Sequence, residues 1–336
     1  MRVRRSQQVY ARSSVCYAGY MAPQFPSDKR AQTAPESVPV RAREGHSTAS
    51  ARVGNADSIT SRDNKWLKIF RAALRGSGPA ESEPIAGEGP KLVEEGVRSG
   101  LETEALLVSE TGERHLERIL QVASESDSGI PRSRIFRTTD KLFESVAGTE
   151  APQGLAALFR QRAWNFDDVM RGRANLAGVF SGGLPLMVVM AAVQDPGNVG
   201  TIVRSAEAFG ASGVVATRGT ADPWSPKALR ASAGSALRLP LLRGMAIPIL
   251  LAQLRVAGVT IVAAGTRPTA AGPPTADLRG ACAIFIGNEG AGLPGEVEHA
   301  ADDWVSIAMK NDVESLNAGV AASVILFEAA RQRRGA

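Results

Sequence analysis

The chain has 336 residues, of which 44% are hydrophobic and 22% charged, and its formal net charge is +5. This length allows two domains, no apolar run is long enough to span a bilayer, and the positive charge suits a nucleic-acid partner without requiring one. The two cysteines, Cys16 and Cys282, exclude a disulfide framework and a cysteine-rich metal site, and the three histidines lack ligand spacing, so no metal is expected.

An unstructured basic tail is predicted for residues 1–62, which are rich in Ser, Arg, Ala, Pro and Gln. Residues 1–30 have the composition of an organellar transit peptide, but translation from an upstream start codon in a GC-rich bacterial gene gives the same kind of tail. The second interpretation is favoured, so the expected location is the bacterial cytoplasm. No apolar segment of the kind found in secretory signals is present in the tail.

A first folded domain is predicted for residues 63–160, where helical and extended segments alternate. Helices are expected at 66–74, 90–97, 115–123 and 140–146, and strands at 105–108, 135–137 and within 152–158. Residues 76–89 predict a loop because they are rich in Gly, Pro and Glu. The pattern indicates a compact α/β sandwich without a catalytic constellation, and a scaffold or a substrate-docking module fits it equally well. Residues 161–182 are interpreted as a linker.

The second domain, residues 183–334, is organised around its first strand–loop–helix unit. Residues 186–193 form an apolar run that is typical of a buried parallel strand, and an Asp-Pro-Gly turn follows. Asn198 is then predicted to cap an amphipathic helix. Arg204 lies on that helix, where its side chain can reach back to the positive helix start and hold an anion such as a phosphate diester. A capped helix with a solvated arginine explains the same pattern.

Basic residues also stand beside a short helix of small residues. Lys227 and Arg230 flank or lie within the run 228–235, whose small side chains let a ligand approach the backbone closely. Cations at such a place suit RNA phosphates. A tightly packed helix with no ligand is the alternative.

The remaining segments repeat the pattern of a strand followed by a polar or glycine-rich loop. Strands are expected at 213–216, 260–264, 281–286 and 304–309, and a helix at 247–257. The loop 287–293, GNEGAGL, leaves peptide groups exposed at a strand end, where they can bind an adenine or a ribose. Ser315 is predicted to cap the last helix. The apolar stripe of that helix comprises Leu316, Val320, Val324 and Phe327.

Three motifs together resemble those of the SpoU/TrmH-type RNA 2′-O-methyltransferases of the SPOUT superfamily. They are DPGNVG with Arg204, IGNEGAGL, and SIAMKNDVESLNAGVAAS, and the resemblance covers residues 183–334. Upstream, EGPKLVEEGVRSG and APQGLAAL are similar to the L30e-like substrate-binding domain of that family. The resemblance implies an α/β fold whose parallel-sheet domain contains a deep trefoil knot, a smaller N-terminal domain, a homodimer, and S-adenosylmethionine as cofactor.

The resemblance also implies the residues of the site. Cofactor contacts, largely through the backbone, are expected from Gly265, Gly287, Ile307, Met309 and Leu316. The catalytic centre is expected to contain Asn198 and Arg204, supported by Glu289, Ser315 and Asn317. Two departures from the third motif, Ala308 and Ala318, remove no functional group.

The implied reaction is methyl transfer to a ribose 2′-hydroxyl, which needs no metal. Arg204 is usually described as activating the hydroxyl, but a guanidinium stays protonated, so it can instead hold a phosphate and stabilise an alkoxide. By analogy rRNA is favoured over tRNA as substrate. The alternatives are a tRNA 2′-O-methyltransferase, a knotted enzyme that methylates a base, and a non-catalytic RNA-binding or ribosome-assembly protein. A nucleotide-dependent oxidoreductase is disfavoured because GxGxxG is missing after the first strand.

Overall fold

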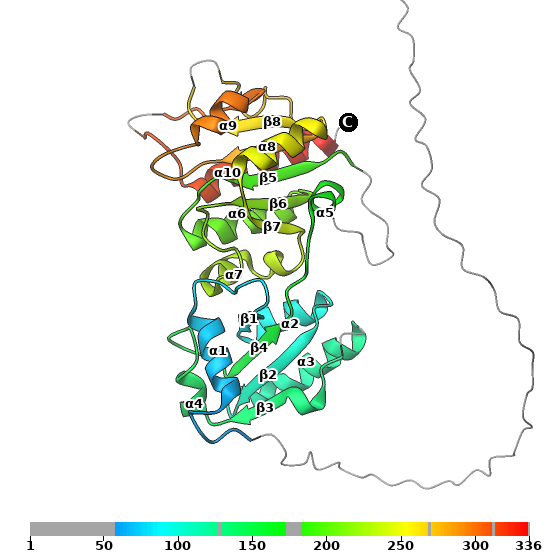
Figure 1. Ribbon diagram of the computed structural model, residues 1–336, viewed down its shortest axis with the longest axis vertical. Coiled ribbons are helices and arrows are strands. Elements are labelled where there is room, and N and C mark those ends of the chain that lie inside the picture. Colours follow the sequence, from blue (N-terminus) through cyan, green and yellow to red (C-terminus); the bar gives the residue numbers. More distant parts are fainter. Residues whose placement is uncertain (1–57, 127–128, 173–182, 268–269, 311–312, 335–336) are drawn as a thin grey trace, which may run out of the picture. The chain divides into compact units, whose positions relative to one another are not determined.

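The computed structural model describes residues 58–126, 129–172, 183–267, 270–310 and 313–334. Within these ranges the chain forms a four-stranded sheet followed by a six-stranded sheet, each covered by helices (Figure 1). No helix in this part of the chain combines the length and apolar character needed to cross a membrane.

The N-terminal domain is built on a mixed sheet with the strand order β1-β4-β2-β3. Its strands are β1 (Ile85–Glu88), β2 (Thr103–Ser109), β3 (Ile135–Thr138) and β4 (Leu155–Phe159). Its helices are α1 (Lys65–Arg75), α2 (Pro90–Arg98), α3 (Glu113–Glu125) and α4 (Asp140–Glu144), with a 3₁₀ turn at Arg132–Arg134. Helices α2 and α3 pack on one face and α1 and α4 on the other, so the sheet is buried on both sides (Figure 1).

This domain extends further toward the N-terminus than the predicted tail allows. Ile59 is 4% exposed, its peptide N–H donates to the carbonyl of Arg137 at 2.8 Å, and its carbonyl accepts from Thr138 Oγ1 at 3.1 Å. Residues 1–57 of the predicted tail, including Cys16 and the transit-peptide-like residues, lie outside the described residues. Ile59 was overlooked because one apolar residue in a polar stretch gives no periodicity.

Two further segments differ from the sequence prediction. Strand β1 lies inside the predicted loop 76–89, and it was missed because four residues are too few to show alternation. The predicted linker contains helix α5 (Phe166–Arg171), which begins with a reciprocal capping box between Asn165 and Asp168. Helix α5 buries Val169 completely against the second sheet, so this part of the linker is packed structure.

The C-terminal domain is a parallel sheet with the order β10-β8-β9-β5-β6-β7. Its strands are β5 (Leu186–Met190), β6 (Gly213–Thr217), β7 (Leu241–Met245), β8 (Thr260–Ala264), β9 (Cys282–Ile286) and β10 (Asp303–Val305). Its helices are α6 (Pro196–Ala208), α7 (Pro226–Ser232), α8 (Ile247–Val256), α9 (Gly295–Ala300) and α10 (Ala318–Arg334), with a 3₁₀ turn at Ser235–Leu237. The prediction of a parallel α/β sheet with a smaller N-terminal domain is confirmed, whereas β7 was not predicted.

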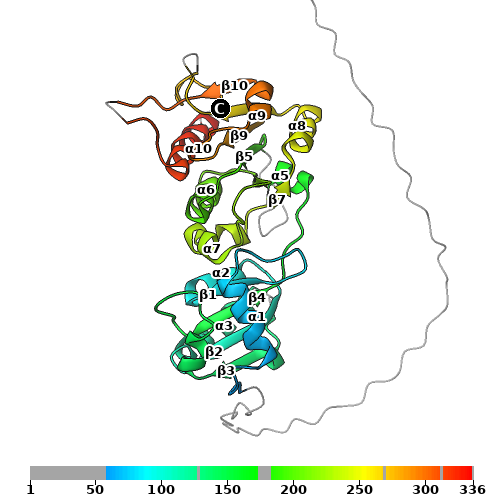
Figure 2. The ribbon, with the colours of Figure 1, turned by 60° about the vertical axis from the view of Figure 1, so that its left-hand side comes forward.

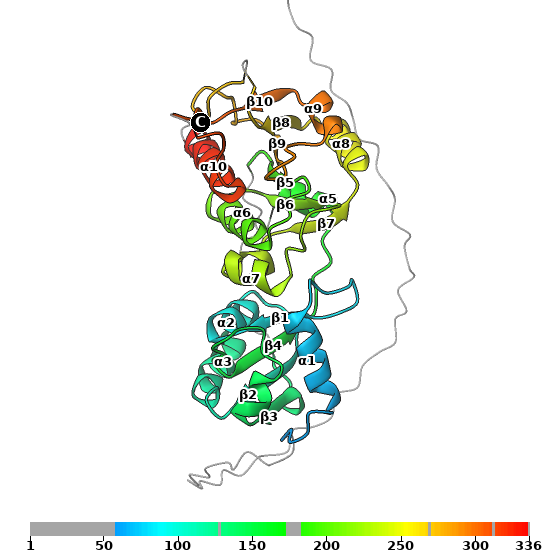
Figure 3. The ribbon, with the colours of Figure 1, turned by 90° about the vertical axis from the view of Figure 1, so that its left-hand side faces the viewer.

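The helices of this domain separate into two layers. Helices α6, α7 and α10 share one core with residues of the sheet, and α5, α8 and α9 share the core on the opposite face (Figures 2 and 3). Alternate residues of β5 enter the two cores: Val188 belongs to the first and Val189 to the second. A strand buried on both faces explains the uninterrupted apolar run in the sequence.

Helix α6 begins three residues earlier than predicted. Its N-cap is Asp195, whose side chain accepts from the peptide N–H of Gly197, and Pro196 occupies the first helical position, where no N–H is needed. The prediction that Asn198 is the N-cap is therefore wrong. Asn198 lies in the first turn with only 8% of its surface exposed, so its amide is available for a tertiary contact.

Helix α10 also differs from its prediction in both its start and its orientation. Asn317, and not Ser315, caps it, because Asn317 Oδ1 accepts from the peptide N–H groups of Gly319 and Val320 at 2.9 and 3.2 Å. Of the predicted apolar stripe, Leu316 precedes the helix, and Val320, Val324 and Phe327 face solvent. The helix packs on the sheet through another face, which includes Ala322, Ile325, Leu326 and Ala329. The strand predicted at 304–309 is also shorter in the structure, because β10 ends at Val305 and the chain leaves the sheet there.

Candidate active site

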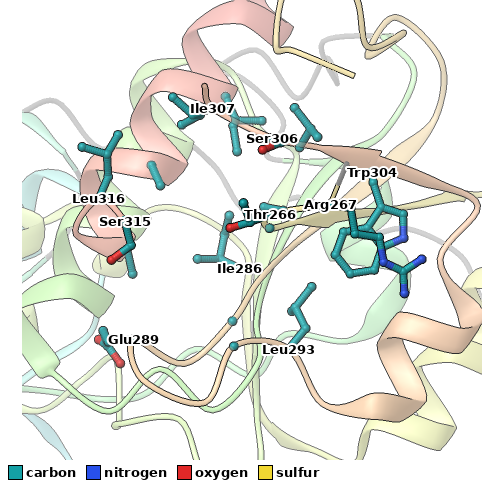
Figure 4. A pocket seen from close by; sticks show the side chains of 18 of the residues that line it. Thr266, Arg267, Ile286, Glu289, Leu293, Trp304, Ser306, Ile307, Ser315 and Leu316 are labelled. Carbon is teal, nitrogen blue, oxygen red and sulfur yellow. The ribbon is translucent and has the colours of Figure 1, made fainter. Parts of the chain in front are cut away.

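A cavity of about 620 Å³ lies at the carboxyl ends of β8, β9 and β10. Three segments supply most of its lining: residues 264–267 after β8, residues within 286–293 after β9, and residues 304–309 and 313–316 in and after β10 (Figure 4). All five residues predicted to contact a cofactor line it, namely Gly265, Gly287, Ile307, Met309 and Leu316. Parallel strands bring these segments together because their carboxyl ends meet at one edge of the sheet.

The loop after β9 is held in a tight, closed shape. Asn288 and Gly292 exchange two backbone hydrogen bonds of 2.9 and 3.0 Å. The Asn288 side chain donates to the carbonyl of Ala192 at 2.9 Å and accepts from the peptide N–H groups of Gly290 and Ala291. Gly287 faces the closing strand so closely that a Cβ atom there would lie 2.5 Å from the carbonyl carbon of Gly292. Asn288, which the sequence analysis did not select, therefore shapes the loop.

The lining of the cavity matches the chemistry of S-adenosylmethionine. Ile286, Leu293 and Ile307 supply apolar walls for a flat heteroaromatic ring (Figure 4). Within the described part of the chain, the peptide groups of residues 307–309 make no backbone hydrogen bond, so they are available to the polar edge of a ligand. The volume is in the range of small-molecule sites, and Glu289 places negative charge on the wall, which suits a sulfonium cation.

A stacked pair closes one side of the cavity and was not anticipated. The guanidinium of Arg267 lies 4.0 Å from the ring centroid of Trp304, and both residues line the cavity (Figure 4). Neither residue belongs to a recognisable motif, since they follow different strands and are far apart in the sequence. Only the tertiary structure shows that they are neighbours.

A chain of three polar side chains connects the cavity wall to helices α6 and α10. Asn317 Oδ1 accepts from the N-terminal peptide groups of α10, so its Nδ2 is directed at Asn198 Oδ1, 2.7 Å away. Asn198 Nδ2 in turn donates to Glu289 Oε1 at 2.7 Å. The helix terminus therefore fixes the direction of both amides, and the chain ends on a carboxylate that faces the cavity.

Glu289 remains ionised in this environment. Partial burial raises the pKa of Glu289, but the bond from Asn198 and the bonds from peptide N–H groups outweigh it, and the net effect is a pKa below the ordinary value. Gln194 supplies one of these peptide bonds, with its N–H 3.4 Å from Glu289 Oε2. Ser315 lies on the same side of the cavity as Glu289 (Figure 4).

Arg204 is the predicted site residue that the structure does not bring into this cluster. Its side chain is exposed on α6, and it forms no hydrogen bond or ion pair with the residues that the structure describes. Six residues separate it from Asn198, which is about one and two-thirds helical turns, so the two side chains leave α6 on different sides. The predicted reach of Arg204 back to the helix start is not observed.

Lys227 and Arg230 project from α7 into a second groove. Lys227 Nζ lies 2.6 Å from Asp195 Oδ1, which joins α7 to the N-cap of α6, and this bond lowers the pKa of Asp195. Arg230 is exposed. Both residues, together with Pro196 and Arg75, line a groove of about 780 Å³ beside the first motif. Within the described ranges, no group of three His, Cys, Asp or Glu side chains is arranged to hold a metal.

Comparisons with known proteins match both domains. A sequence model of the SpoU rRNA Methylase family matches residues 185–327, and one of the MRM3-like substrate binding domain matches residues 81–157. An uncharacterized tRNA/rRNA methyltransferase of Mycobacterium ulcerans (strain Agy99) is 34% identical over 261 residues, which cover 76% of this chain and 78% of that protein.

Two further relatives are similar along nearly their whole length. The 23S rRNA (guanosine(2553)-2′-O)-methyltransferase RlmP of Bacillus subtilis (strain 168) is 29% identical over 272 residues, covering 80% of this chain and 97% of RlmP. The crystal structure of an AdoMet-bound rRNA methyltransferase from Sinorhizobium meliloti superposes with a TM-score of 0.69 at 28% identity, covering 83% of this chain and 98% of that one.

Proposed function

Because the chain belongs to the SpoU rRNA methylase family, we propose that it transfers a methyl group from S-adenosylmethionine to a ribose 2′-hydroxyl of RNA. The observation that carries this proposal is the meeting of the cofactor-sized cavity with the hydrogen-bonded chain of Glu289, Asn198 and Asn317. A cavity alone would suit many ligands. A cavity whose wall carries a fixed carboxylate and amide suits a reaction at a hydroxyl group.

The residues around the cavity divide the work of holding the cofactor. The peptide groups of residues 307–309 and the loop at Gly287 bind the polar edges of the ligand, and Leu316 packs against it. Gly265 and Met309 complete the wall. When bound, S-adenosylmethionine supplies an electrophilic methyl group on a sulfonium centre. The protein then has to exclude water and align the hydroxyl with that methyl group.

Basic residues outside the cavity bind the RNA. Lys227 and Arg230 hold phosphates in the groove beside the first motif, where they position the strand without reading its bases. Arg204 holds the phosphate next to the target ribose and stabilises negative charge that develops on its oxygen, because a guanidinium can donate but cannot accept a proton. The substrate is rRNA in preference to tRNA, which is supported by the match to a substrate-binding domain and by the 23S rRNA specificity in the name of RlmP.

The protein acts as a homodimer, and the support for this is the outward stripe of α10. Val320, Val324 and Phe327 are 47%, 39% and 53% exposed, and Phe327 makes an edge contact with Phe209, the C-cap of α6, at 5.9 Å between ring centroids. A row of apolar side chains on one helix is typical of an interface. A second copy seated there covers the outward face of α10 and the end of α6 at Phe209.

The dimer has a direct test with a matched control. Val324→Glu places a charge in the stripe and should convert the protein to a monomer in light scattering coupled to gel filtration. Val256→Glu is the control, because Val256 is 91% exposed and lies on α8, on the other face of the sheet. A monomeric wild type, or equal behaviour of the two variants, would exclude this interface.

The deep trefoil knot belongs to the same proposal. Its support is the path that the chain takes after β10. There the chain leaves one edge of the sheet, passes the loops that follow β8 and β9, and continues into α10, which packs on α6. The test is to join the N-terminus and the C-terminus of the folded chain covalently and then to denature the ring that results. A knotted ring stays more compact than an unknotted ring of the same length.

Methyl transfer is tested with the purified protein, tritiated S-adenosylmethionine, and unmodified transcripts of 23S rRNA, 16S rRNA and tRNA. Label should appear as a 2′-O-methyl nucleoside in an rRNA digest. Label on a base would overturn the chemistry, and label only in tRNA would overturn the substrate preference. Cofactor binding without transfer to any transcript would favour a non-catalytic RNA-binding protein.

Arg204→Ala separates the role of this residue from that of the cofactor cavity. The variant should lose turnover and keep its affinity for S-adenosylmethionine, because Arg204 does not line the cavity. Arg218→Ala is a suitable control, since Arg218 is another exposed arginine of this domain and is not assigned to the site. Retained turnover in Arg204→Ala would remove Arg204 from the catalytic centre.

A further inference from the structure

The charges on the cavity wall are unequal in number. Among the described residues that line the cavity, Arg267 is the one that carries a positive charge. Three carboxylates line the same cavity, those of Glu289, Glu298 and Glu314. S-adenosylmethionine has the reverse balance, because it carries two cations, a sulfonium and an ammonium, and a single anion, its α-carboxylate. The cation of the wall therefore matches the one anionic group of the ligand.

The guanidinium of Arg267 has hydrogen-bond donors that are not in use. Its side chain is exposed and forms no hydrogen bond or ion pair with the residues that the structure describes. The N–H donors of a guanidinium lie in one plane, so stacking on an aromatic ring engages its face and not these donors. The donors of Arg267 can therefore bind both oxygens of a carboxylate while the stack on Trp304 persists.

Trp304 holds this guanidinium at the cavity. Trp304 lies in β10, opposite Ala263 of β8, and packs against the core that contains α8 and α9. Gly265 lets the ring come close, because a Cβ atom there would lie 3.1 Å from Trp304 Cζ3. The Cζ atom of Arg267 lies 4.0 Å from the ring centroid. A long side chain that rests on a fixed ring loses less conformational freedom when a ligand binds.

We infer that Arg267, held on Trp304, binds the α-carboxylate of S-adenosylmethionine and makes the cavity selective for a cofactor with an amino-acid group. The inference rests on the proposed function and adds to it a residue outside the three motifs. Trp304 is the positioning residue of the pair. Figure 4 shows Arg267 and Trp304 on the side of the cavity away from Glu289 and Ser315, so this contact is separate from the proposed catalytic side chains.

The α-carboxylate does not react during methyl transfer and is unchanged in the product, S-adenosylhomocysteine. A contact with it therefore stabilises the bound cofactor and the transition state equally. Removing Arg267 should raise the KM for S-adenosylmethionine and leave kcat unchanged. Removing Arg204 should have the opposite effect, a loss of turnover with cofactor affinity retained.

A phosphate of the RNA is the other anion that an exposed arginine of this protein can meet. The place of Arg267 favours the cofactor, because Arg267 lines the same cavity as the apolar wall and the peptide groups proposed to bind the adenosine. Lys227 and Arg230, which are proposed to bind phosphates, line a different groove beside the first motif.

The test compares two ligands in calorimetric titrations of the full chain. One is S-adenosylhomocysteine, and the other is its decarboxylated analogue, in which hydrogen replaces the α-carboxylate and the adenosine, thioether and ammonium remain. The wild type should bind S-adenosylhomocysteine about 10-fold more tightly than the analogue, as expected for a hydrogen-bonded ion pair. Arg267→Met should bind S-adenosylhomocysteine about 10-fold more weakly than the wild type does, and the analogue with unchanged affinity.

Matched variants separate carboxylate binding from a structural role. Arg218→Met is the control, because Arg218 is an exposed arginine of the same domain and does not line the cavity, so both affinities should stay unchanged. Arg267→Lys keeps the charge without the planar donors and should bind S-adenosylhomocysteine with an intermediate affinity. Trp304→Phe keeps an aromatic face and should retain the discrimination between the two ligands, whereas Trp304→Leu, checked for folding by circular dichroism, should lose it.

Two results would overturn the inference. Arg267→Met that weakens both ligands equally would place Arg267 against the adenosine. Arg267→Met that weakens neither ligand would separate Arg267 from the cofactor, and weaker RNA binding in the same variant would assign it to a phosphate. The proposed function fails in a different way, when a wild type that binds S-adenosylhomocysteine labels none of the transcripts, and the comparison of the two ligands then still decides the role of Arg267.

Discussion

Replacing Gly287 with alanine should damage the cofactor cavity by a mechanism that the structure makes quantitative. An added Cβ would lie 2.5 Å from the carbonyl carbon of Gly292 and 2.8 Å from the amide nitrogen of Leu293. Bringing these contacts to 3.4 Å requires the facing backbone to move by about 0.6 to 0.9 Å. That backbone is tied to Asn288 by two hydrogen bonds and is part of the cavity wall, so it cannot move without deforming the site.

Overpacking of this kind costs about 1 to 3 kcal/mol, so the dissociation constant for S-adenosylmethionine should rise by roughly 5- to 150-fold. Calorimetric titration measures this constant, and circular dichroism checks that the variant is folded. Gly290→Ala is the matched control in the same loop, because a Cβ at Gly290 meets only Asn288 Oδ1 at an ordinary 3.7 Å. A folded Gly287→Ala with wild-type affinity, or an equal loss in Gly290→Ala, would refute the reasoning.

Two predictions concern stability. Arg333 donates to the carbonyls of Leu184 at 2.6 Å and of Leu278 at 2.8 Å, so Arg333→Ala should lower the free energy of unfolding by about 2 kcal/mol in a urea titration. The control Arg334→Ala, at an exposed arginine, should lower it by less than about 0.5 kcal/mol. Equal urea midpoints for the two variants would contradict this prediction. Asp302 has a pKa below its ordinary value, because burial, which raises it, is outweighed by bonds from the Ile261 peptide and Arg255. The contribution of Asp302 to stability is present above its unfolded-state pKa and is lost as the pH falls through its folded-state pKa. The free energy of unfolding of Asp302→Asn should therefore depend less on pH in the acid range than that of the wild type. An unchanged acid-unfolding midpoint in Asp302→Asn would exclude this contribution.

The family and the general fold could be predicted from the sequence because their signals are local. An apolar run such as that of β5 predicts a buried strand, and the Asp-Pro-Gly turn before α6 and the glycine-rich loop after β9 are contiguous in the chain. Three such motifs in a fixed order identify the family, and the comparisons confirm that assignment. The residues proposed to contact the cofactor could be named for the same reason, and they line one cavity.

Helix ends were predicted less well, because several residues near a terminus can cap it. Asp195 and Asn198 both stand near the start of α6, and Ser315 and Asn317 both precede α10, so composition alone does not choose between them. The structure chooses Asp195 and Asn317. The choice has chemical consequences, since it leaves Asn198 free to bind Glu289.

The sequence by itself therefore determined the family, the parallel sheet and the order of the functional loops, because each depends on residues that are adjacent or regularly spaced. Only the tertiary structure decided which side chains meet. Glu289 lies 91 residues and Asn317 lies 119 residues from Asn198 in the sequence, yet two hydrogen bonds of 2.7 Å connect the three side chains. Likewise the apolar stripe of α10 predicts a helix but not the direction it faces, because periodicity fixes a face and packing decides what covers it.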